Sequence, residues 1–160
     1  MRIGHGYDVH SFEAGRPLLL GGVHFEEERG LAGHSDGDAA VHAAVDALLG
    51  AAALGDIGTH FPSSEERWRD ANSLDLMKQT VILVASAGYA IVNLDITIVA
   101  QTPRVSPRVQ EMRAALAGAT GIEVAAVSIK ATTTDGLGAV GRGEGVAAYA
   151  VALIEERPAP

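Results

Sequence analysis

Residues 33 to 58, with the sequence GHSDGDAAVHAAVDALLGAAALGDIG, decide how the rest of the chain is arranged. They open with a polar loop from His34 to Gly37 and continue as a long run of Ala, Val and Leu. This run is apolar nearly all round, which predicts a helix from about Asp38 to Leu54 that is buried on most of its faces. Ser35 or Asp36 is expected to cap it, because short side chains with an oxygen accept the free N–H groups at a helix start.

Three polar residues interrupt this helix. Asp38, His42 and Asp46 are four positions apart, so they share one face. A buried polar stripe needs partners. One interpretation is a structural network in which the two Asp side chains hold His42. The other makes His42 a metal ligand that Asp38 or Asp46 orients. The helix alone favours the structural network, and the rest of the chain shifts the balance toward a metal.

The composition limits the class of protein. The 160 residues predict one domain, residues 1–160, that is long enough for a proper core. The lack of cysteine excludes disulfides, thiolate chemistry and cysteine-based structural zinc. A net charge of −8 without a basic run argues against nucleic acid as a partner. The longest apolar run, near Val81–Val92, is too short for a membrane span of about 20 residues, so we expect a cytoplasmic protein.

The remaining elements follow from periodicity and from Gly, Pro and capping residues. Their order predicts an α+β (mixed α/β) fold, in which one mixed sheet carries helices on one face, with a small β-hairpin beside it. The expected segments are strands at Met1–His10, Tyr89–Gln101, Val127–Thr133 and Gly143–Glu155, a hairpin at Pro17–Phe25, a charged surface segment at Glu26–Arg29, a helix at Ser73–Ala87, a helix from Ser106 to between Gly118 and Gly121, and a flap at His60–Asn72.

Asp8 and His10 make a candidate pair of metal ligands. They lie two apart in an expected strand, so both side chains point to the same face. Taken alone, the pair is equally typical of an ordinary polar strand face. Combined with His42, it provides three N and O ligands and leaves one tetrahedral position open, as catalytic zinc requires.

Two further segments suit phosphate groups. His34 and Ser35 head the buried helix, where free N–H groups and the helix dipole favour an anion. The hydroxyl and carboxylate groups of Thr132–Asp135 suit phosphate oxygens and a hard metal such as Mg²⁺. The sequence therefore predicts phosphoryl or pyrophosphate transfer. Residues 136–141 match G-x-G-x-x-G, but a strand follows them instead of a helix, so we do not expect a dinucleotide fold.

Together these residues form motifs that resemble one known family. The motifs are RIGHGYDVH at 2–10, HSDGD at 34–38 with His42 and Asp46, LGDIG at 54–58, KATTT at 130–134 and GRGEG at 141–145. Over essentially its whole length the chain resembles the 2-C-methyl-D-erythritol 2,4-cyclodiphosphate synthase family of the non-mevalonate isoprenoid pathway. The resemblance implies conversion of 4-diphosphocytidyl-2-C-methyl-D-erythritol 2-phosphate to the cyclic diphosphate and CMP, by attack of the 2-phosphate on the β-phosphate.

The resemblance also implies the cofactors and the assembly. The implied metal ligands are Asp8, His10 and His42 for Zn²⁺ and Asp135 for Mg²⁺ or Mn²⁺. His34 and Thr133 would stabilise the transition state. The family is a homotrimer whose sheets surround the three-fold axis and whose active sites lie between subunits. In some members a central channel accepts isoprenoid diphosphates, near the position of Arg142 in this chain.

The substrate contacts that the resemblance implies fall into groups. The methylerythritol part is expected at Asp56, Ile57 and Gly58 and under a flap formed by Phe61, Pro62, Ser63, Ser64 and Glu65. The cytidine part is expected at Ala100, Gln101, Thr102, Pro103, Arg104, Val105, Ser106 and Thr132. The set is completed by Ser35, Thr134, Ala139 and Arg142. The chain departs from the family's common residues at Ser63, where Asp is common, at Arg104 (Lys), at Asp135 (Glu) and at Ala139 (an aromatic residue).

Two other functions could use the same residues. A zinc hydrolase of nucleotide diphosphates would place a metal-bound water in the open position, with Asp38 or Asp46 as its base. It would leave a linear product. A non-catalytic trimer would bind isoprenoid or cytidine phosphates without turnover.

Overall fold

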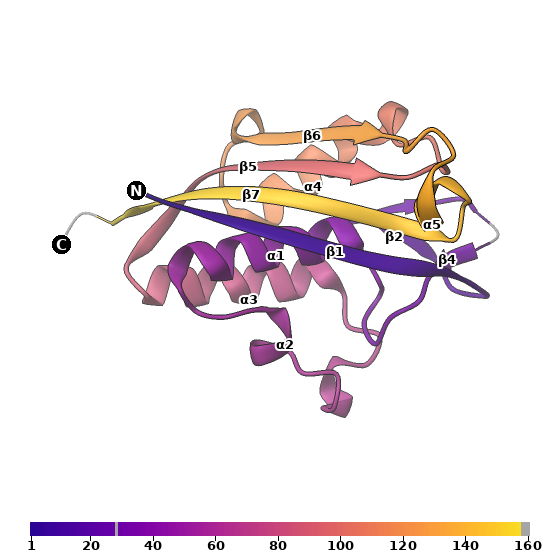
Figure 1. The fold of residues 1–160 in the computed structure, drawn as a ribbon. Helices are drawn as coiled ribbons and strands as arrows, with labels where there is room; N and C mark the ends of the chain where they lie inside the picture. The colour runs from indigo at the N-terminus through magenta and orange to yellow at the C-terminus, as the bar shows by residue number, and fades with distance from the viewer. Residues whose placement is uncertain (28, 158–160) are drawn as a thin grey trace.

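The structure is a computed structural model that describes residues 1–27 and 29–157. Its centre is a mixed sheet with the strand order β4-β1-β7-β5-β6 (Figure 1). Neighbouring strands are antiparallel except β5 and β6, which are parallel. The strands are β1 (Arg2–Ala14), β4 (Arg29–Leu31), β5 (Tyr89–Val99), β6 (Val127–Thr132) and β7 (Gly145–Glu156). The mixed sheet expected from the sequence is confirmed.

The hairpin lies where the sequence predicts it. β2 (Leu18–Leu20) and β3 (Val23–Phe25) form a separate antiparallel sheet. Gly21 and Gly22 connect them with φ angles of 59° and 77°, the left-handed values that a two-residue turn needs at both positions. A side chain at either position would be strained.

One strand is not predicted by the sequence. The segment Glu26–Arg29 reads as charged surface, yet Arg29 begins β4, which pairs with the end of β1. Three residues are too few to show an alternating pattern. A Cβ on the buried Gly30 would lie 2.1 Å from the carbonyl oxygen of Pro17. β4 therefore depends on a tertiary contact that periodicity does not display.

Helices cover one face of the sheet (Figure 1). α1 (Ala39–Ala52) packs on β1, β7 and β5, α3 (Ser73–Ser86) packs on α1 and β5, and α4 (Val109–Thr120) packs on β6 and α3. The short elements are α2 (Ile57–His60), α5 (Gly138–Gly141) and the 3₁₀ turns η1 (Glu66–Trp68), η2 (Ser106–Arg108) and η3 (Val124–Ala126). Within the described ranges no helix is long and apolar enough to cross a membrane.

α1 is buried as expected but is capped differently. Every residue of α1 except Asp46 and Gly50 is buried. The cap is Asp38, whose carboxylate accepts the N–H of Val41 at 3.1 Å. The prediction of Ser35 or Asp36 as the cap is wrong, because the loop ends two residues further along the chain than its composition suggests.

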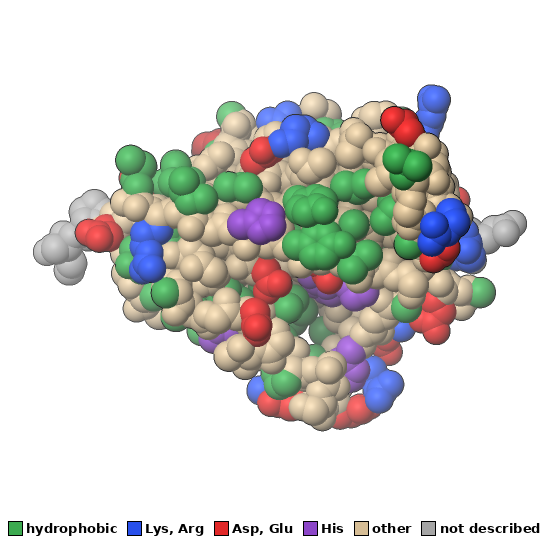
Figure 2. Space-filling model, viewed as in Figure 1, with side chains coloured by type: hydrophobic (Ala, Val, Ile, Leu, Met, Phe, Trp, Pro, Cys, Tyr) green, Lys and Arg blue, Asp and Glu red, His purple; other side chains and the backbone are tan. Residues whose placement is uncertain are grey.

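The face of the sheet opposite the helices carries exposed apolar side chains, and we call it the outer sheet face. Ile3, Tyr7 and Val9 of β1 and Tyr149 and Val151 of β7 are each at least 41% exposed. The rings of Tyr7 and Tyr149 lie 4.9 Å apart on paired positions of the two strands. Figure 2 shows hydrophobic side chains gathered over the middle of these strands. An apolar surface of this kind is typical of an interface.

Candidate active site

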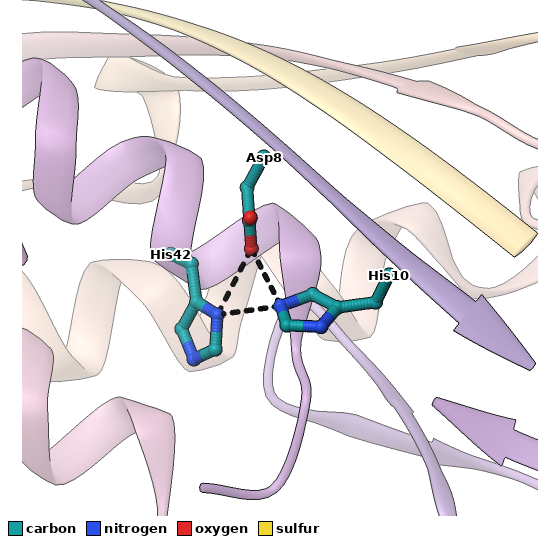
Figure 3. A group of neighbouring side chains, drawn as sticks. All are labelled: Asp8, His10 and His42. Carbon is teal, nitrogen blue, oxygen red and sulfur yellow. Dashed lines mark hydrogen bonds and ion pairs between the residues drawn. The ribbon is translucent and has the colours of Figure 1, made fainter. Parts of the chain in front are cut away.

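The three expected metal ligands meet at one point (Figure 3). Oδ2 of Asp8 lies 2.8 Å from Nε2 of His10 and 3.0 Å from Nδ1 of His42. The two imidazole nitrogens are 3.1 Å apart. We call these residues the Asp–His–His cluster. Asp8 and His10 come from β1 and His42 from α1, so the cluster joins the sheet to its central helix.

Alternation along β1 explains how the strand ligands reach the helix. Gly4, Gly6, Asp8 and His10 lie two apart and therefore point to the same face. The two glycines are buried against α1, and the two ligands continue this face where the strand runs past His42. The expectation that the side chains of Asp8 and His10 point to the same face of one strand is confirmed.

The cluster fits a divalent metal ion. A tetrahedral ion with bonds of about 2.0–2.1 Å separates its ligand atoms by about 3.3 Å, close to the separations found here. His10 also forms a hydrogen bond with the backbone of Ala32, and Nε2 of His42 lies 2.9 Å from Oγ of Ser73. The opposite ring nitrogens can therefore direct lone pairs at the shared point. Two imidazoles and a carboxylate are typical ligands of zinc and related transition metals.

Charge within the cluster favours an anionic Asp8. Burial raises the pKa of Asp8, but hydrogen bonds from His10 and His42 and their positive charge outweigh burial and leave this pKa well below its ordinary value. Burial lowers the pKa of His10, but the hydrogen bond to Asp8 and its charge outweigh burial and leave this pKa raised. A metal must therefore displace a proton from His10 when the pH is low.

The cluster lies in the wall of a cavity of about 220 Å³. Its lining contains the expected catalytic residue His34 and the expected substrate contacts Ser35, Ile57, Gly58, Phe61 and Ser63. Nε2 of His34 lies 3.2 Å from the carbonyl oxygen of Glu65, so the expected flap borders this cavity. Pro62 and Ser64 belong to the same flap. Figure 2 shows a hollow with histidine side chains between the sheet and the lobe that contains α2.

Asp38 and Asp46 do not orient His42, contrary to the sequence interpretation. Asp38 accepts the N–H groups of Gly21 at 2.9 Å, Gly22 at 2.6 Å and Val41. It therefore ties the hairpin turn to the start of α1. Asp46 accepts the N–H of Ile57 at 2.7 Å and holds the loop that leads into α2. A spacing of four places side chains on one face, but it does not say which backbone groups lie opposite that face.

All but one of the expected cytidine contacts line a second pocket, and the exception, Thr102, lines a separate cavity with Phe12 and Arg29. The second pocket is lined by Ala100, Gln101, Pro103, Arg104, Val105, Ser106, Thr132 and Thr133, together with Ala131. Thr133 donates its hydroxyl to Oδ1 of Asp135 at 3.1 Å in the loop beyond β6. Among the described residues, the two pockets have no lining residue in common. Within one chain the structure does not bring Thr133 into the pocket of the Asp–His–His cluster.

The other expected residues occupy surface positions. Asp56 is exposed and accepts the N–H and the hydroxyl of Thr59 at 2.8 Å and 2.7 Å, at the start of α2. Thr134 donates to the carbonyl oxygen of Leu137 at 2.6 Å. Ala139 lies in α5, and the Nε of Arg142 just beyond it donates to Glu144 at 2.6 Å.

The sequence interpretation assigns no role in the site to four residues that belong to it. Trp68 and Leu76 line the cavity, Ser73 lies within hydrogen-bond distance of His42, and Asp36 accepts a hydrogen bond from Ser73. The sequence signal for Trp68 is its position as the only tryptophan, between two arginines of a polar segment. Ser73 shows no signal beyond that of a helix start, because its partner is 31 positions away in the chain.

The sequence pattern of the YgbB family matches residues 1–155. The chain belongs to the YgbB family. A similar member is the 2-C-methyl-D-erythritol 2,4-cyclodiphosphate synthase of Symbiobacterium thermophilum, 58% identical over 157 residues, which cover 98% of this chain and 100% of that protein. The motifs quoted from the sequence therefore belong to a YgbB chain, as the resemblance implies.

Solved structures agree with this membership. The bifunctional IspDF of Campylobacter jejuni matches with a TM-score of 0.94 and 40% identity, over 98% of this chain and 42% of that longer chain. The IspF of Plasmodium falciparum, solved as a CDP complex, matches with a TM-score of 0.86 and 31% identity, over 98% and 97% of the two chains. The mixed sheet and its helices are thus those of the YgbB fold.

Proposed function

We propose that this chain converts 4-diphosphocytidyl-2-C-methyl-D-erythritol 2-phosphate into 2-C-methyl-D-erythritol 2,4-cyclodiphosphate and CMP, a step in non-mevalonate isoprenoid biosynthesis. The observation that carries the proposal is the Asp–His–His cluster in the wall of a cavity, in a chain 58% identical to a protein named for that product. In the reaction, an oxygen of the 2-phosphate forms a bond to the β-phosphorus. The bond from that phosphorus to the oxygen shared with the α-phosphate breaks, and CMP leaves with both electrons of that bond.

A divalent ion at the cluster, which we propose is Zn²⁺, would supply positive charge to the phosphate oxygens at the reacting phosphorus. Asp8, His10 and His42 would hold it. The cluster contributes one negative charge and two neutral imidazoles, so a bound dication keeps a net positive charge. That charge favours the diphosphate over water as the group at the open position.

The remaining roles are assigned to residues on the two pockets. His34 lines the same cavity as the cluster, and it would donate a hydrogen bond to the phosphate that gains charge in the transition state. Gly58 and the neighbouring Asp56 would hold the methylerythritol hydroxyls. The flap from Phe61 to Glu65 would exclude water, so that the 2-phosphate and not water reaches the phosphorus.

The nucleotide half of the substrate is assigned to the second pocket. The loop 100–106 would hold cytidine, and Thr133 would stabilise the transition state. Asp135 would bind a second ion, Mg²⁺ or Mn²⁺, that arrives with the diphosphate. The CDP complex of the Plasmodium relative supports a cytidine diphosphate ligand.

We further propose that the active protein is a homotrimer with its sites between subunits. Two observations support this. The two pockets are separate within one chain, although one substrate must reach both. The outer sheet face is apolar and contains the exposed Tyr7 and Tyr149. Packing these faces around a three-fold axis would bury them and set the cluster of one copy opposite the nucleotide loop of the next.

The direct test follows ³¹P NMR spectra of the substrate with purified protein, Zn²⁺ and Mg²⁺. We expect the coupled pair of phosphorus signals of a cyclic diphosphate, together with CMP. The variant His42→Ala should give neither. An unchanged substrate with the native protein would refute the proposal. A linear methylerythritol bisphosphate, with oxygen from solvent, would instead assign the site to hydrolysis.

A further inference from the structure

Ser73 connects the Asp–His–His cluster to a carboxylate outside it. Ser73 is the first residue of α3, and only 1% of it is exposed. Its Oγ lies 2.9 Å from Nε2 of His42, and its hydroxyl donates to Oδ1 of Asp36. The other oxygen of Asp36 accepts the N–H of Ser73 at 2.8 Å. Asp36, Ser73 and His42 thus form a chain of hydrogen bonds that ends at the cluster.

The number of hydrogens on each group decides which group donates and which accepts in this series of hydrogen bonds. A serine hydroxyl has one hydrogen, and a carboxylate has none to donate. Because the hydroxyl of Ser73 donates to Asp36, its oxygen turns lone pairs toward Nε2 of His42. Nε2 must then carry a ring hydrogen, which leaves Nδ1 as the nitrogen that binds a metal ion; without a metal, Nδ1 lies 3.0 Å from Oδ2 of Asp8 and donates to it instead. Oγ of Ser35, 3.1 Å from the same Nε2, is a second acceptor.

Backbone contacts hold Asp36 in place. Its own N–H donates to the carbonyl oxygen of Ala71 at 3.1 Å, and its Oδ1 accepts the N–H of Asp38 at 3.2 Å. The carboxylate therefore bridges the loop before α1 and the start of α3. Because Asp36 is held through both its backbone N–H and its carboxylate, it can keep the hydroxyl of Ser73 in one orientation. Ser73 in turn keeps the imidazole of His42 in one orientation.

We propose that Asp36 and Ser73 are positioning residues, which fix the ring hydrogen of His42 on Nε2 and so present Nδ1 to the metal ion. This inference deepens the metal site of the proposed function and rests on it. Metal-binding histidines commonly donate their second N–H to a carboxylate or another oxygen, and loss of that partner weakens metal binding by about 10–100-fold. Here the carboxylate that orients His42 is Asp36, and it acts through Ser73. The helix spacing instead suggests Asp38 or Asp46 for this orienting role.

The first experiment measures the affinity for Zn²⁺ alone, by competition with a coloured chelator and without substrate. We expect Ser73→Ala and Asp36→Asn to bind Zn²⁺ about 10–100-fold more weakly than the native protein. In Asp36→Asn the amide can donate to Ser73, and the serine hydroxyl is then free to donate to Nε2 of His42. The hydrogen bonds would then run in the opposite direction. The matched control is Asn72→Ala. Asn72 caps the same helix by accepting the N–H of Leu74 at 2.8 Å and is exposed, so its loss should leave zinc affinity unchanged.

The second experiment uses the zinc-loaded, labelled protein, in which the ¹⁵N shifts of His42 distinguish the metal-bound ring nitrogen from the nitrogen that carries the hydrogen. We expect a metal-bound Nδ1 and a protected Nε2–H in the native protein and in Asn72→Ala, and faster exchange of this hydrogen with water in Ser73→Ala and Asp36→Asn. A native His42 that binds zinc through Nε2 would overturn the inference, and so would variants with native zinc affinity. The expected Nε2–H without cyclisation of the substrate would count against the proposed function instead.

Discussion

Gly6 of β1 lies against the backbone of Ala43 in α1: a Cβ on Gly6 would be 1.9 Å from the carbonyl oxygen of Ala43. Gly4 meets the carbonyl oxygen of Ala47 one helical turn further on, with the same 1.9 Å. The strand and the helix therefore approach as closely as their backbones allow. This contact lets His42, the neighbour of Ala43, reach Asp8.

Gly6→Ala is expected to destroy this contact. The added methyl group meets backbone, which cannot rotate away, so α1 must shift from β1 at a cost of about 3 kcal/mol or more in the free energy of unfolding. Zinc affinity should fall with it. Urea unfolding and chelator competition measure both. Gly50→Ala is the control, because no atom lies within 4 Å of a Cβ there and a helical alanine gains up to about 1 kcal/mol. Equal stability of the two variants would contradict the close approach.

Zinc affinity should depend on pH through His10. The pKa of His10 is raised in the metal-free protein, and zinc binds only the deprotonated ring. Below this pKa the affinity should rise about tenfold per pH unit, and above it the affinity should level off. Asp8 contributes no change near neutrality, since its pKa is lowered and it stays anionic. Calorimetry at a series of pH values tests this expectation. An affinity that stays flat as the pH rises from about 5 to the ordinary histidine pKa of about 6.5 would refute it.

Asp38→Ala should destabilise the fold, because two buried N–H groups and one partly buried N–H group lose their acceptor. We expect a loss of about 3 kcal/mol in the free energy of unfolding, measured in urea. Burial raises the pKa of Asp38, so the folded protein binds this proton more tightly than the unfolded chain. The stabilising effect of Asp38 is therefore largest below its unfolded pKa of about 3.9 and decreases as the pH rises toward its folded value.

The difference between native protein and Asp38→Ala should accordingly be larger at pH 4 than at pH 7. Asp75→Ala is the control: Asp75 is exposed and pairs with Lys78, so its loss should cost less than about 1 kcal/mol. A native-to-variant difference that grows with pH would mean that Asp38 is stabilised as an anion.

Trp68 offers an optical probe of the cavity. It is the only tryptophan of the chain, lines the same cavity as the cluster, and packs edge-on against Phe61 with ring centres 5.1 Å apart. Co²⁺ bound at the cluster should quench its fluorescence, because a nearby coloured metal ion accepts the excitation energy. His42→Ala should abolish quenching at the same Co²⁺ concentrations. Quenching that persists in this variant would place the metal elsewhere.

The proposed trimer predicts that two inactive variants rescue each other. His42→Ala keeps the nucleotide loop, and Thr133→Ala keeps the cluster. If each site takes these parts from neighbouring copies, trimers refolded from a mixture contain some complete sites. Activity should appear in the mixture and not in either variant alone. A mixture as inactive as its components would show that each site lies within one chain.

The outer sheet face should determine assembly. Tyr149→Arg places a charge in its centre and should give monomers in sedimentation velocity, with cyclase activity lost and the cluster's zinc affinity retained. Ile82→Arg changes a residue that is 64% exposed on α3, away from this face, and should remain a trimer. Trimers of Tyr149→Arg would contradict an interface on the outer sheet face.

The sequence by itself determines the elements whose signals are local. The apolar run of α1 predicts a buried helix, and the alternation of β1 places Asp8 and His10 on one face. The ligand types then indicate a metal, since two histidines and an aspartate suit a transition metal and the chain has no cysteine. These inferences hold because a helix or strand period relates neighbours in the chain, whatever packs against them.

Only the tertiary structure decides the partners. The sequence suggests Asp36 as a helix cap and Asp38 and Asp46 as partners of His42. In the structure Asp38 holds the hairpin turn, Asp46 holds the loop before α2, and Asp36 reaches His42 through Ser73. Which backbone N–H or hydroxyl a carboxylate meets depends on segments tens of residues away. The distance between β1 and α1, which the buried Gly4 and Gly6 set, brings these segments together, and no periodicity in the sequence records that distance.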